Sequence, residues 1–278
     1  MRKRLRLMAV TAHPDDESLG MGGTLARYAD EGVETFLLTA TRGENGRHGR
    51  AVRESPAALG RLRESELRAA CAVLGVSELT FLGYTDGALD RVWAAEAIDR
   101  IATEIQRVRP DVVVTFGPEG AYGHPDHIAI SQFTTAAVVQ AARWHQVSKL
   151  YYLAWTEAKW DAYQTALKKL TSRVDGVERQ AIPWADWAVT TVLDTARYWP
   201  IAWRAVSFHE SQMSVYEKLR GLPAEQHAAL WGSQEFYRAF SLVNGGRRTE
   251  RDLFEGLREN CNEAAAYTGA APHADRCA

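Results

Sequence analysis

A histidine and three acidic residues stand together near the start of the chain, directly after an apolar run, in the stretch AHPDDESLGMGG at residues 12–23. Carboxylates this close in sequence repel one another unless a cation or hydrogen-bond donors compensate. The stretch then turns at once into glycines and an apolar, helix-like segment. The stretch therefore predicts a buried strand before it, a helix after it, and a cation or hydrogen-bond donors that balance its charge.

Apolar runs and amphipathic segments alternate through the first 150 residues. Strands are expected at residues 6–11, 33–40, 79–83 and 111–116, and helices at 22–30, 62–74, 94–108 and about 128–144. Such alternation is typical of a parallel sheet with helices on its faces. The acidic stretch then lies in the first strand-to-helix loop, at the edge of the sheet where ligand sites gather.

The alternation is weaker after residue 150. Strands are expected at 149–153 and 189–193, and helices at 196–208 and 215–219. Eight of the nine tryptophans lie between Trp144 and Trp231, which favours aromatic packing over the sheet, with a sugar-stacking platform as the alternative. No linker marks a boundary, so we expect one domain over 1–278, with a core at 1–150, a variable half at 151–261 and a frayed tail at 262–278.

Composition excludes several classes of protein. The net charge of −2 does not favour nucleic-acid binding, and no apolar run approaches the length of a membrane span. The basic start is followed by too short an apolar stretch for a signal peptide. Three widely spaced cysteines suggest neither a disulfide framework nor a cysteine zinc site. We expect a soluble cytoplasmic protein.

A second histidine-rich loop, which contains His124, Asp126 and His127, follows the strand expected at 111–116. Both loops leave the carboxyl ends of strands and therefore share one edge of a parallel sheet. His13, Asp16 and His127 would then offer two imidazoles and one carboxylate. Three protein ligands with one open position are the pattern of catalytic zinc.

The remaining polar side chains complete a set for metal-assisted hydrolysis. Asp15 is left to take a proton from water, and His124 to donate to the oxyanion or leaving group, with Asp126 holding its orientation. Alternatively, Asp15, Asp16 and Glu17 form an acidic cluster stabilised by a helix dipole. Two His-Pro-Asp segments, each after a strand and before a helix, favour the metal site.

Competing chemistries fit less well. The glycines at 20–23 do not have the G-x-G-x-x-G spacing, and the neighbouring acids would repel a pyrophosphate. No G-x-S-x-G elbow is present, and Cys71 falls within an expected helix. Two-metal phosphoesterases need more ligands than can be assigned. A metal-dependent hydrolase of another amide or ester bond, and a non-catalytic binding protein on the same fold, remain as alternatives.

The two loops resemble the LmbE-like, or PIG-L, family of zinc-dependent deacetylases, through AHPDDE at 12–17 and GHPDH at 123–127. Weaker matches lie at 43–44, 63–67, 83–86 and 209–212, and the similarity is good over about residues 5–145. The resemblance implies a Rossmann-like sheet. It also implies hydrolysis of the acetamide of an N-acetylglucosamine-containing small molecule to acetate and a free amine.

The resemblance also implies roles for individual residues. Zn²⁺, or another divalent ion such as Fe²⁺, would be bound by His13, Asp16 and His127. Asp15 would be the general base, and His124 would stabilise or protonate the tetrahedral intermediate.

Further positions match less specific parts of the family pattern. Tyr122 stands where deacetylases of thiol-cofactor biosynthesis carry a tyrosine that assists the oxyanion. Arg63, Asp86, Glu44 and His209 are expected to contact substrate. The alternatives are a helix-surface salt bridge for Arg63, a turn-forming role for Asp86 and a core position for His209.

The substrate's second part is left open. Conjugates of N-acetylglucosamine with inositol or malate, antibiotic intermediates and chitooligosaccharides are all candidates, and the basic loop at 42–53 slightly favours a carboxylate such as malate. A homo-oligomer is also left open. Glu17 is expected to support the site rather than bind metal, and the other histidines are expected at the surface: His48, His145, His227 and His273.

Overall fold

The computed structural model describes residues 4–46, 55–167, 171–174, 176–180, 182–244 and 248–258. Its sheet contains β1 (Arg6–Thr11), β2 (Glu34–Thr41), β3 (Glu78–Tyr84), β4 (Val112–Thr115), β5 (Lys149–Leu153), β8 (Thr191–Asp194) and β9 (Ser233–Ser241). The strand order is β3-β2-β1-β4-β5-β9-β8. The first five strands in this order run parallel, and β9 is antiparallel to both β5 and β8. The predicted α/β fold with a mostly parallel sheet is confirmed.

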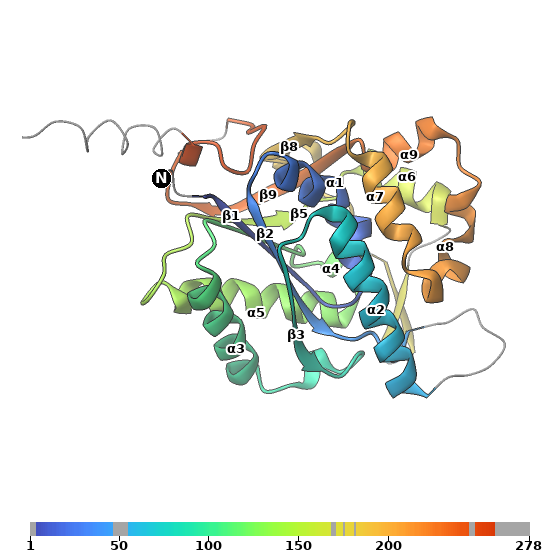
Figure 1. Cartoon of the computed structure of the whole chain (residues 1–278), viewed down its shortest axis with the longest axis horizontal. Coiled ribbons are helices and arrows are strands. Elements are labelled where there is room, and N and C mark those ends of the chain that lie inside the picture. The colour runs from blue at the N-terminus through green and yellow to red at the C-terminus, as the bar shows by residue number, and fades with distance from the viewer. Residues whose placement is uncertain are drawn as a thin grey trace, which may run out of the picture.

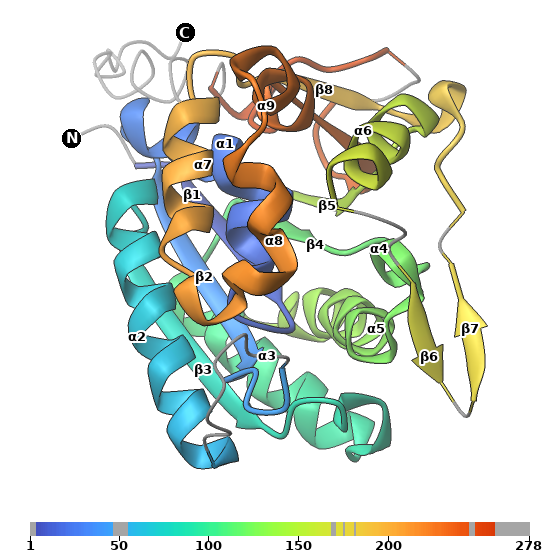
Figure 2. The same ribbon diagram turned by 90° about the vertical axis from the view of Figure 1, so that its right-hand side faces the viewer.

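Helices cover both faces of the sheet. α1 (Asp16–Asp30), α2 (Pro56–Leu74) and α7 (Trp199–Ser207) lie on one side, and α3 (Ala94–Val108) and α5 (Pro125–Ala141) on the other (Figure 1). α6 (Glu157–Leu167), α8 (Met213–Arg220) and α9 (Ala224–Trp231) pack together beside α7. Figure 2 shows the hairpin of β6 (Ser172–Val174) and β7 (Val177–Arg179) extending away from the sheet. The short helical segments are α4 (Gly120–Gly123) and the 3₁₀ turns Leu89–Arg91, Asp186–Ala188 and Glu210–Gln212.

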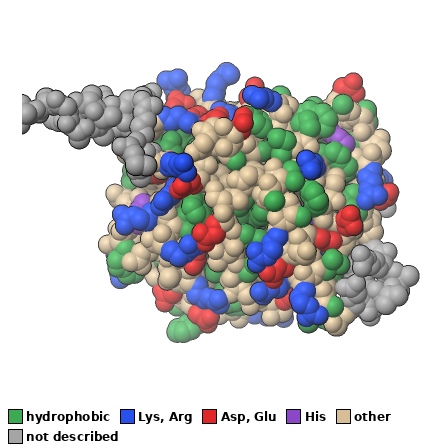
Figure 3. All heavy atoms as spheres, viewed as in Figure 1, with side chains coloured by type: hydrophobic (Ala, Val, Ile, Leu, Met, Phe, Trp, Pro, Cys, Tyr) green, Lys and Arg blue, Asp and Glu red, His purple; other side chains and the backbone are tan. Residues whose placement is uncertain are grey.

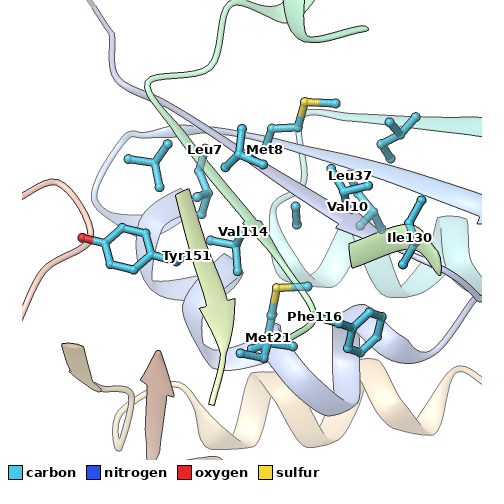
Figure 4. Close-up of a cluster of buried hydrophobic side chains, with 14 of the residues drawn as sticks. Leu7, Met8, Val10, Met21, Leu37, Val114, Phe116, Ile130 and Tyr151 are labelled. Carbon is cyan, nitrogen blue, oxygen red and sulfur yellow. The ribbon is translucent and has the colours of Figure 1, made fainter. Parts of the chain in front are cut away.

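The core is centred on β1 and β4, which are adjacent and buried on both faces. Strands in this position read as continuous apolar runs, which is why they are visible in the sequence. Figure 4 shows Leu7 and Val10 of β1 packed in one cluster with Val114 of β4 and Met21 of α1. This packing fixes where the loops after β1 and β4 begin.

The helix after the acidic stretch begins at Asp16, six residues before the predicted start, so Asp16 and Glu17 lie in its first turn. Gly20, Gly22 and Gly23 are buried inside this helix. A Cβ atom on Gly22 would lie 2.9 Å from the Cβ of Ala202 on α7. The glycine therefore allows α1 and α7 to approach closely.

The second half completes the same sheet, because β9 pairs with β5 and β8 pairs with β9. Strand β9, helices α6 and α9 and the β6–β7 hairpin are absent from the sequence prediction. The division at residue 150 stays a prediction. The predicted tail at 262–278 and most of the basic loop at 42–53 lie outside the described residues.

Aromatic packing in the second half is confirmed for part of the tryptophan set. Trp231 is fully buried, and its ring stacks on Trp203 with centroids 6.0 Å apart. His227 lies 4.7 Å from the Trp203 ring and is buried, so its predicted surface position is wrong. The ring nitrogen of His227 bonds the Leu219 carbonyl oxygen, which satisfies its polar atom inside the apolar cluster.

Charged side chains of both signs are interspersed on the face shown in Figure 3, in keeping with a net charge of −2. Among the described residues, no helix has both the length and the apolar character that crossing a membrane requires.

Candidate active site

The loops after β1 and β4 meet at one edge of the sheet, as the sequence predicts. His13 follows β1, and His127 lies in the first turn of α5. The Nδ1 atom of His13 is 3.2 Å from the Nε2 atom of His127, and both residues are buried. The two His-Pro-Asp segments therefore form one cluster.

Asp16 adds a carboxylate to this pair of imidazoles. Its Oδ1 is 3.3 Å from His127 Nε2, and its Oδ2 is 3.7 Å from His13 Nδ1. Ligands about 2.0–2.1 Å from a tetrahedral ion stand about 3.3 Å from one another, so these separations fit a divalent cation. Although burial favours the neutral acid, His127 and His13 hold the pKa of Asp16 well below its usual range. Asp16 is therefore ionised and suited to a cation.

The other ring nitrogen of His13 is held by two carboxylates. Nε2 lies 3.0 Å from Asp126 Oδ2 and 3.1 Å from Asp86 Oδ1. Although burial opposes the charged ring, these contacts raise the pKa of His13 to about 10. The two carboxylates keep a proton on Nε2, and a divalent ion would displace the second proton of the ring from Nδ1, which faces the cluster. A carboxylate behind a metal-binding histidine is the usual arrangement in such sites.

Asp126 does not orient His124 through its carboxylate, contrary to the sequence prediction. That carboxylate accepts the backbone N–H of Gly87 at 2.7 Å and of Leu89 at 3.0 Å, besides contacting His13. Only the backbone N–H of Asp126 touches His124, donating to its Nδ1 at 3.2 Å. The backbone N–H groups of Gly87 and Leu89, in the loop after β3, thus hold this carboxylate in place.

This backbone contact decides which nitrogen of His124 carries the proton. Nδ1 accepts a hydrogen bond, so the neutral ring has its proton on Nε2. Burial and the nearby rings of His127 and His13 lower the pKa of His124 to about 3. His124 is therefore a neutral donor through Nε2. Its ring lies 4.9 Å from that of His13.

Tyr122 lies beside these histidines, as predicted. Its ring centroid is 5.9 Å from that of His124 and 5.3 Å from that of His127. Burial raises the pKa of Tyr122 well above its usual value, so the hydroxyl keeps its proton. The preceding residue, Ala121, has φ of 60°, a left-handed conformation that turns the chain sharply here.

Asp15 stands at the entry to α1 with φ of 107°, a conformation that non-glycine residues rarely adopt. Its Oδ2 accepts from Arg63 Nη2 at 3.1 Å and from the hydroxyl of Tyr216 at 2.8 Å. Burial raises the pKa of Asp15 above its usual range, although the Arg63 guanidinium opposes this. A carboxylate with a raised pKa is a better proton acceptor near neutral pH.

Arg63 is a buried residue rather than a helix-surface one, with 3% of its surface exposed. It donates to the carbonyl oxygens of Pro14 and Gly43, the latter at 2.8 Å, and to Asp15. The surface salt bridge considered as its alternative is made by Glu64, which binds Arg42 and Arg68 instead. Arg63 thus ties the loop after β2 to the loop after β1.

Asp86 and Glu44 lie next to each other, and Asp86 contacts His13 of the cluster. Glu44 Oε1 accepts the backbone N–H of Asp86 at 3.1 Å, and Asp86 Oδ2 accepts that of Asn45 at 3.0 Å. Asp86 is in a turn before Gly87 and also contacts His13, so both its predicted roles are compatible with its position. A pocket of about 480 Å³ adjoins them and is lined by Arg42, Glu44, Asn45, Pro56, Ala57, Gly60, Gly83, Tyr84 and Thr85.

His209 is a core histidine, which decides between its two predicted roles. It is fully buried, and its Nε2 lies 2.9 Å from Glu17 Oε1. Glu17 Oε2 accepts the backbone N–H of Asp15 at 2.9 Å, so Glu17 supports the loop and does not point at the metal cluster. With the described residues in place, His209 has no solvent-accessible surface that a ligand could contact.

Sequence reasoning missed Tyr216. It lies on α8, 201 residues from Asp15, in a segment without a recognisable motif. Its only sequence signal is an aromatic residue within a short amphipathic helix, which is equally typical of core packing.

Two overlapping groups of side chains have the spacing to hold a metal ion. One comprises His13, His124 and His127, and the other His13, Asp86 and Asp126. Both groups contain His13. Asp16 forms a third possible set with His13 and His127, because its carboxylate oxygens lie close to both rings. A buried cluster of histidines and carboxylates that can hold a divalent ion is thus a feature of this edge of the sheet.

Comparisons with known proteins agree with this arrangement. The sequence model of the PIG-L family, described as GlcNAc-PI de-N-acetylase, matches residues 8–138. The 1D-myo-inositol 2-acetamido-2-deoxy-alpha-D-glucopyranoside deacetylase of Mycobacteroides abscessus is 38% identical, over 91% of this chain and 98% of its own length. The protein of the same name from Actinosynnema mirum is 36% identical, over 91% and 97%.

A solved structure supports the fold. A conserved protein of Thermus thermophilus superposes with a TM-score of 0.63 at 26% identity, covering 87% of this chain and 97% of its own. The matched family segment contains both His-Pro-Asp loops, and the curated relatives extend the similarity over most of the chain. The chain therefore belongs to the PIG-L family of de-N-acetylases.

Proposed function

We propose that this chain hydrolyses the acetamide of an N-acetylglucosamine conjugate, releasing acetate and a free amine. The observation that carries the proposal is the placement of Asp15, held by Arg63, beside the cluster of His13, Asp16 and His127. A proton acceptor next to a cation site is what amide hydrolysis requires. A protein that only binds its ligand has no need of such an acceptor.

We propose His13, Asp16 and His127 as the metal ligands. We leave His124 out of the proposed set because its Nδ1 accepts a hydrogen bond, which places the proton of the neutral ring on Nε2. Asp86 and Asp126 contact the Nε2 side of His13, away from the nitrogen that faces His127. Nitrogen and oxygen donors in a three-residue set favour Zn²⁺, with Fe²⁺ as the alternative.

A bound divalent ion would polarise the acetamide carbonyl and make a water molecule more acidic. Asp15 takes the proton of the attacking water as the new C–O bond forms. His124, through Nε2–H, and the protonated hydroxyl of Tyr122 donate to the oxyanion that develops on the carbonyl oxygen. The proton held by Asp15 then passes to the nitrogen of the breaking C–N bond, so that the products are a neutral amine and acetic acid, which releases its proton to solvent and becomes acetate.

Asp86 and Glu44 are the proposed contacts of the sugar hydroxyls, because Glu44 lines the adjoining pocket and Asp86 lies beside Glu44, between that pocket and His13. Glu44 Oε2 is buried without a partner among the described residues. We assign Arg63 to holding Asp15 rather than to substrate, since its Nη1 and Nη2 atoms already donate to protein oxygens. His209 is withdrawn as a substrate contact because it is fully buried.

For the second part of the substrate we propose inositol. Two curated relatives, which this chain matches over nearly their whole length, are named as deacetylases of an inositol conjugate. We give these names more weight than the charge of the basic loop at 42–53, which favoured a malate conjugate. A cytoplasmic location and a homo-oligomeric state stay predictions from the sequence.

Acetate release by the purified protein tests the proposal. The panel contains the N-acetylglucosamine conjugates of inositol and of malate, N,N′-diacetylchitobiose, a simple ester and a phosphoester. We expect fastest release from the inositol conjugate, loss of activity with a chelator and recovery with Zn²⁺. Turnover of only the ester or phosphoester would favour a hydrolase of another bond, and binding without turnover would favour a binding protein.

A further inference from the structure

The carboxylate of Asp15 is held by groups from distant parts of the chain, and both bind the same oxygen. Arg63 on α2 and Tyr216 on α8 each donate to Oδ2, at 3.1 Å and 2.8 Å. A general base uses one oxygen to take a proton. Two donors on Oδ2 leave Oδ1 as the oxygen for that purpose.

The backbone does not fix this orientation by itself. Asp15 precedes the first residue of α1 with φ of 107°, so its side chain is not set by regular helix geometry. Its N–H is anchored on Glu17 Oε2 at 2.9 Å. With the backbone held but the side chain free to rotate, the direction of the carboxylate depends on Arg63 and Tyr216.

Tyr216 is well supported for such a role. Its ring packs against the buried cluster that contains Leu219 and Trp231. The segment before α8 is tied to α2, because Ser211 donates to Glu66 through both its backbone N–H and its hydroxyl, at 2.7 Å each. Helix α2 therefore carries Arg63 and also fixes the approach of α8.

We infer that Tyr216 is a positioning residue for the reaction, whose hydroxyl holds the Asp15 carboxylate in the orientation that accepts a proton from water. This inference rests on the proposed function, since it assigns Tyr216 a part in the same hydrolysis. Because α8 lies in the second half of the chain, the inferred role gives that half a contact with the site. Burial and the neighbouring carboxylate keep the hydroxyl protonated and able to donate, since they raise the pKa of Tyr216 well above its usual value.

The variant Tyr216→Phe removes only the hydroxyl and keeps the ring. A hydrogen bond to a charged group is the interaction lost, so we expect kcat to fall about 10-fold or more, with KM within about twofold of wild type. Bound metal should be unchanged, and the melting temperature should fall by only a few degrees, as expected for one lost hydrogen bond. Crystals of the metal-loaded variant should show the Asp15 carboxylate in a second rotamer that the wild type lacks.

Tyr163→Phe is the matched control. Tyr163 belongs to the same aromatic cluster, but its hydroxyl donates to the Leu19 carbonyl oxygen, which also accepts from Trp231 Nε1 at 3.0 Å. Removing this hydroxyl therefore leaves no buried acceptor without a partner. Its kcat and its Asp15 rotamer should equal those of the wild type.

The possible results separate this inference from the proposed function. An unchanged kcat in Tyr216→Phe, or a raised KM with unchanged kcat, overturns it, the latter making Tyr216 a substrate contact. An unmoved Asp15 carboxylate also overturns it, whatever the rate. If the wild type releases no acetate from any amide in the panel, the proposed function fails, and the Asp15 rotamer alone decides: a displaced carboxylate supports the positioning role.

Discussion

The carboxylate of Asp126 lies 3.0 Å from the Nε2 atom of His13, which comes from a loop 113 residues earlier in the chain. The same carboxylate accepts two backbone N–H groups from the loop after β3. Asp126 thus joins three loops behind the cluster and presents Nδ1 of His13 to it.

Asp126→Asn should weaken metal binding about 10- to 100-fold, the usual effect of losing a carboxylate behind a metal-binding histidine. Competition with a coloured chelator measures the dissociation constant. Asp194→Asn is the control, because this exposed aspartate caps a turn far from the cluster. Equal metal affinity in the two variants would contradict a supporting role for Asp126.

Asp15→Asn should retain bound metal and lose activity by about 100-fold or more, as expected when a general base is removed. Asparagine has the same shape and can still accept from Arg63 and Tyr216, so the loop should keep its structure. Metal analysis and acetate release are measured on the same sample. Full turnover with bound metal would assign proton transfer to another group.

His124→Ala distinguishes the proposed ligand set from the one that includes His124. If His124 only donates to the oxyanion, metal content stays near one per chain while kcat falls about 100-fold. If it binds the ion, metal affinity falls as well. Metal titration beside steady-state kinetics therefore decides whether His124 or Asp16 completes the set with His13 and His127.

Stability should depend on a charge cluster distant from the site. Glu250 is buried, and its Oε1 accepts from Lys149 and Arg238 at 2.7 Å each. Although burial opposes the charged form, Lys149 and the Tyr151 hydroxyl lower the pKa of Glu250 below its usual value. Glu250→Gln leaves Lys149 buried without its counter-ion and should cost about 3 kcal/mol at pH 7.

The sign of the pH dependence follows from the direction of this shift. A carboxylate with a lowered folded pKa stabilises the protein fully above its unfolded pKa of about 4.3, and the contribution is lost as the pH falls through the folded value. Urea unfolding at pH 7 and at pH 3.5 should show a smaller difference between wild type and Glu250→Gln at the lower pH. An equal difference in unfolding free energy at the two pH values would show that the ionised form of Glu250 does not provide the stabilisation.

Several parts of the molecule could be predicted because their signals are local. Strands β1 and β4 are buried on both faces and stand out as apolar runs. The His-Pro-Asp spacing places His13 and His127 after neighbouring parallel strands, so their meeting follows from the alternation of strands and helices. By contrast, β9 begins two residues after α9 ends, and one of its two buried positions is the polar Gln234, so its sequence lacks a clear apolar alternation.

The sequence by itself determined the parallel α/β fold of the first half, the edge of the sheet that carries the site and the side chains that gather there. Only the tertiary structure decided that the Asp126 carboxylate supports His13, that His209 is buried against Glu17, and that Tyr216 reaches Asp15. The physical reason is the range of the interactions. Periodicity and spacing record which face of an element is buried, whereas a hydrogen bond between residues about 100 to 200 positions apart depends on how all the intervening elements pack.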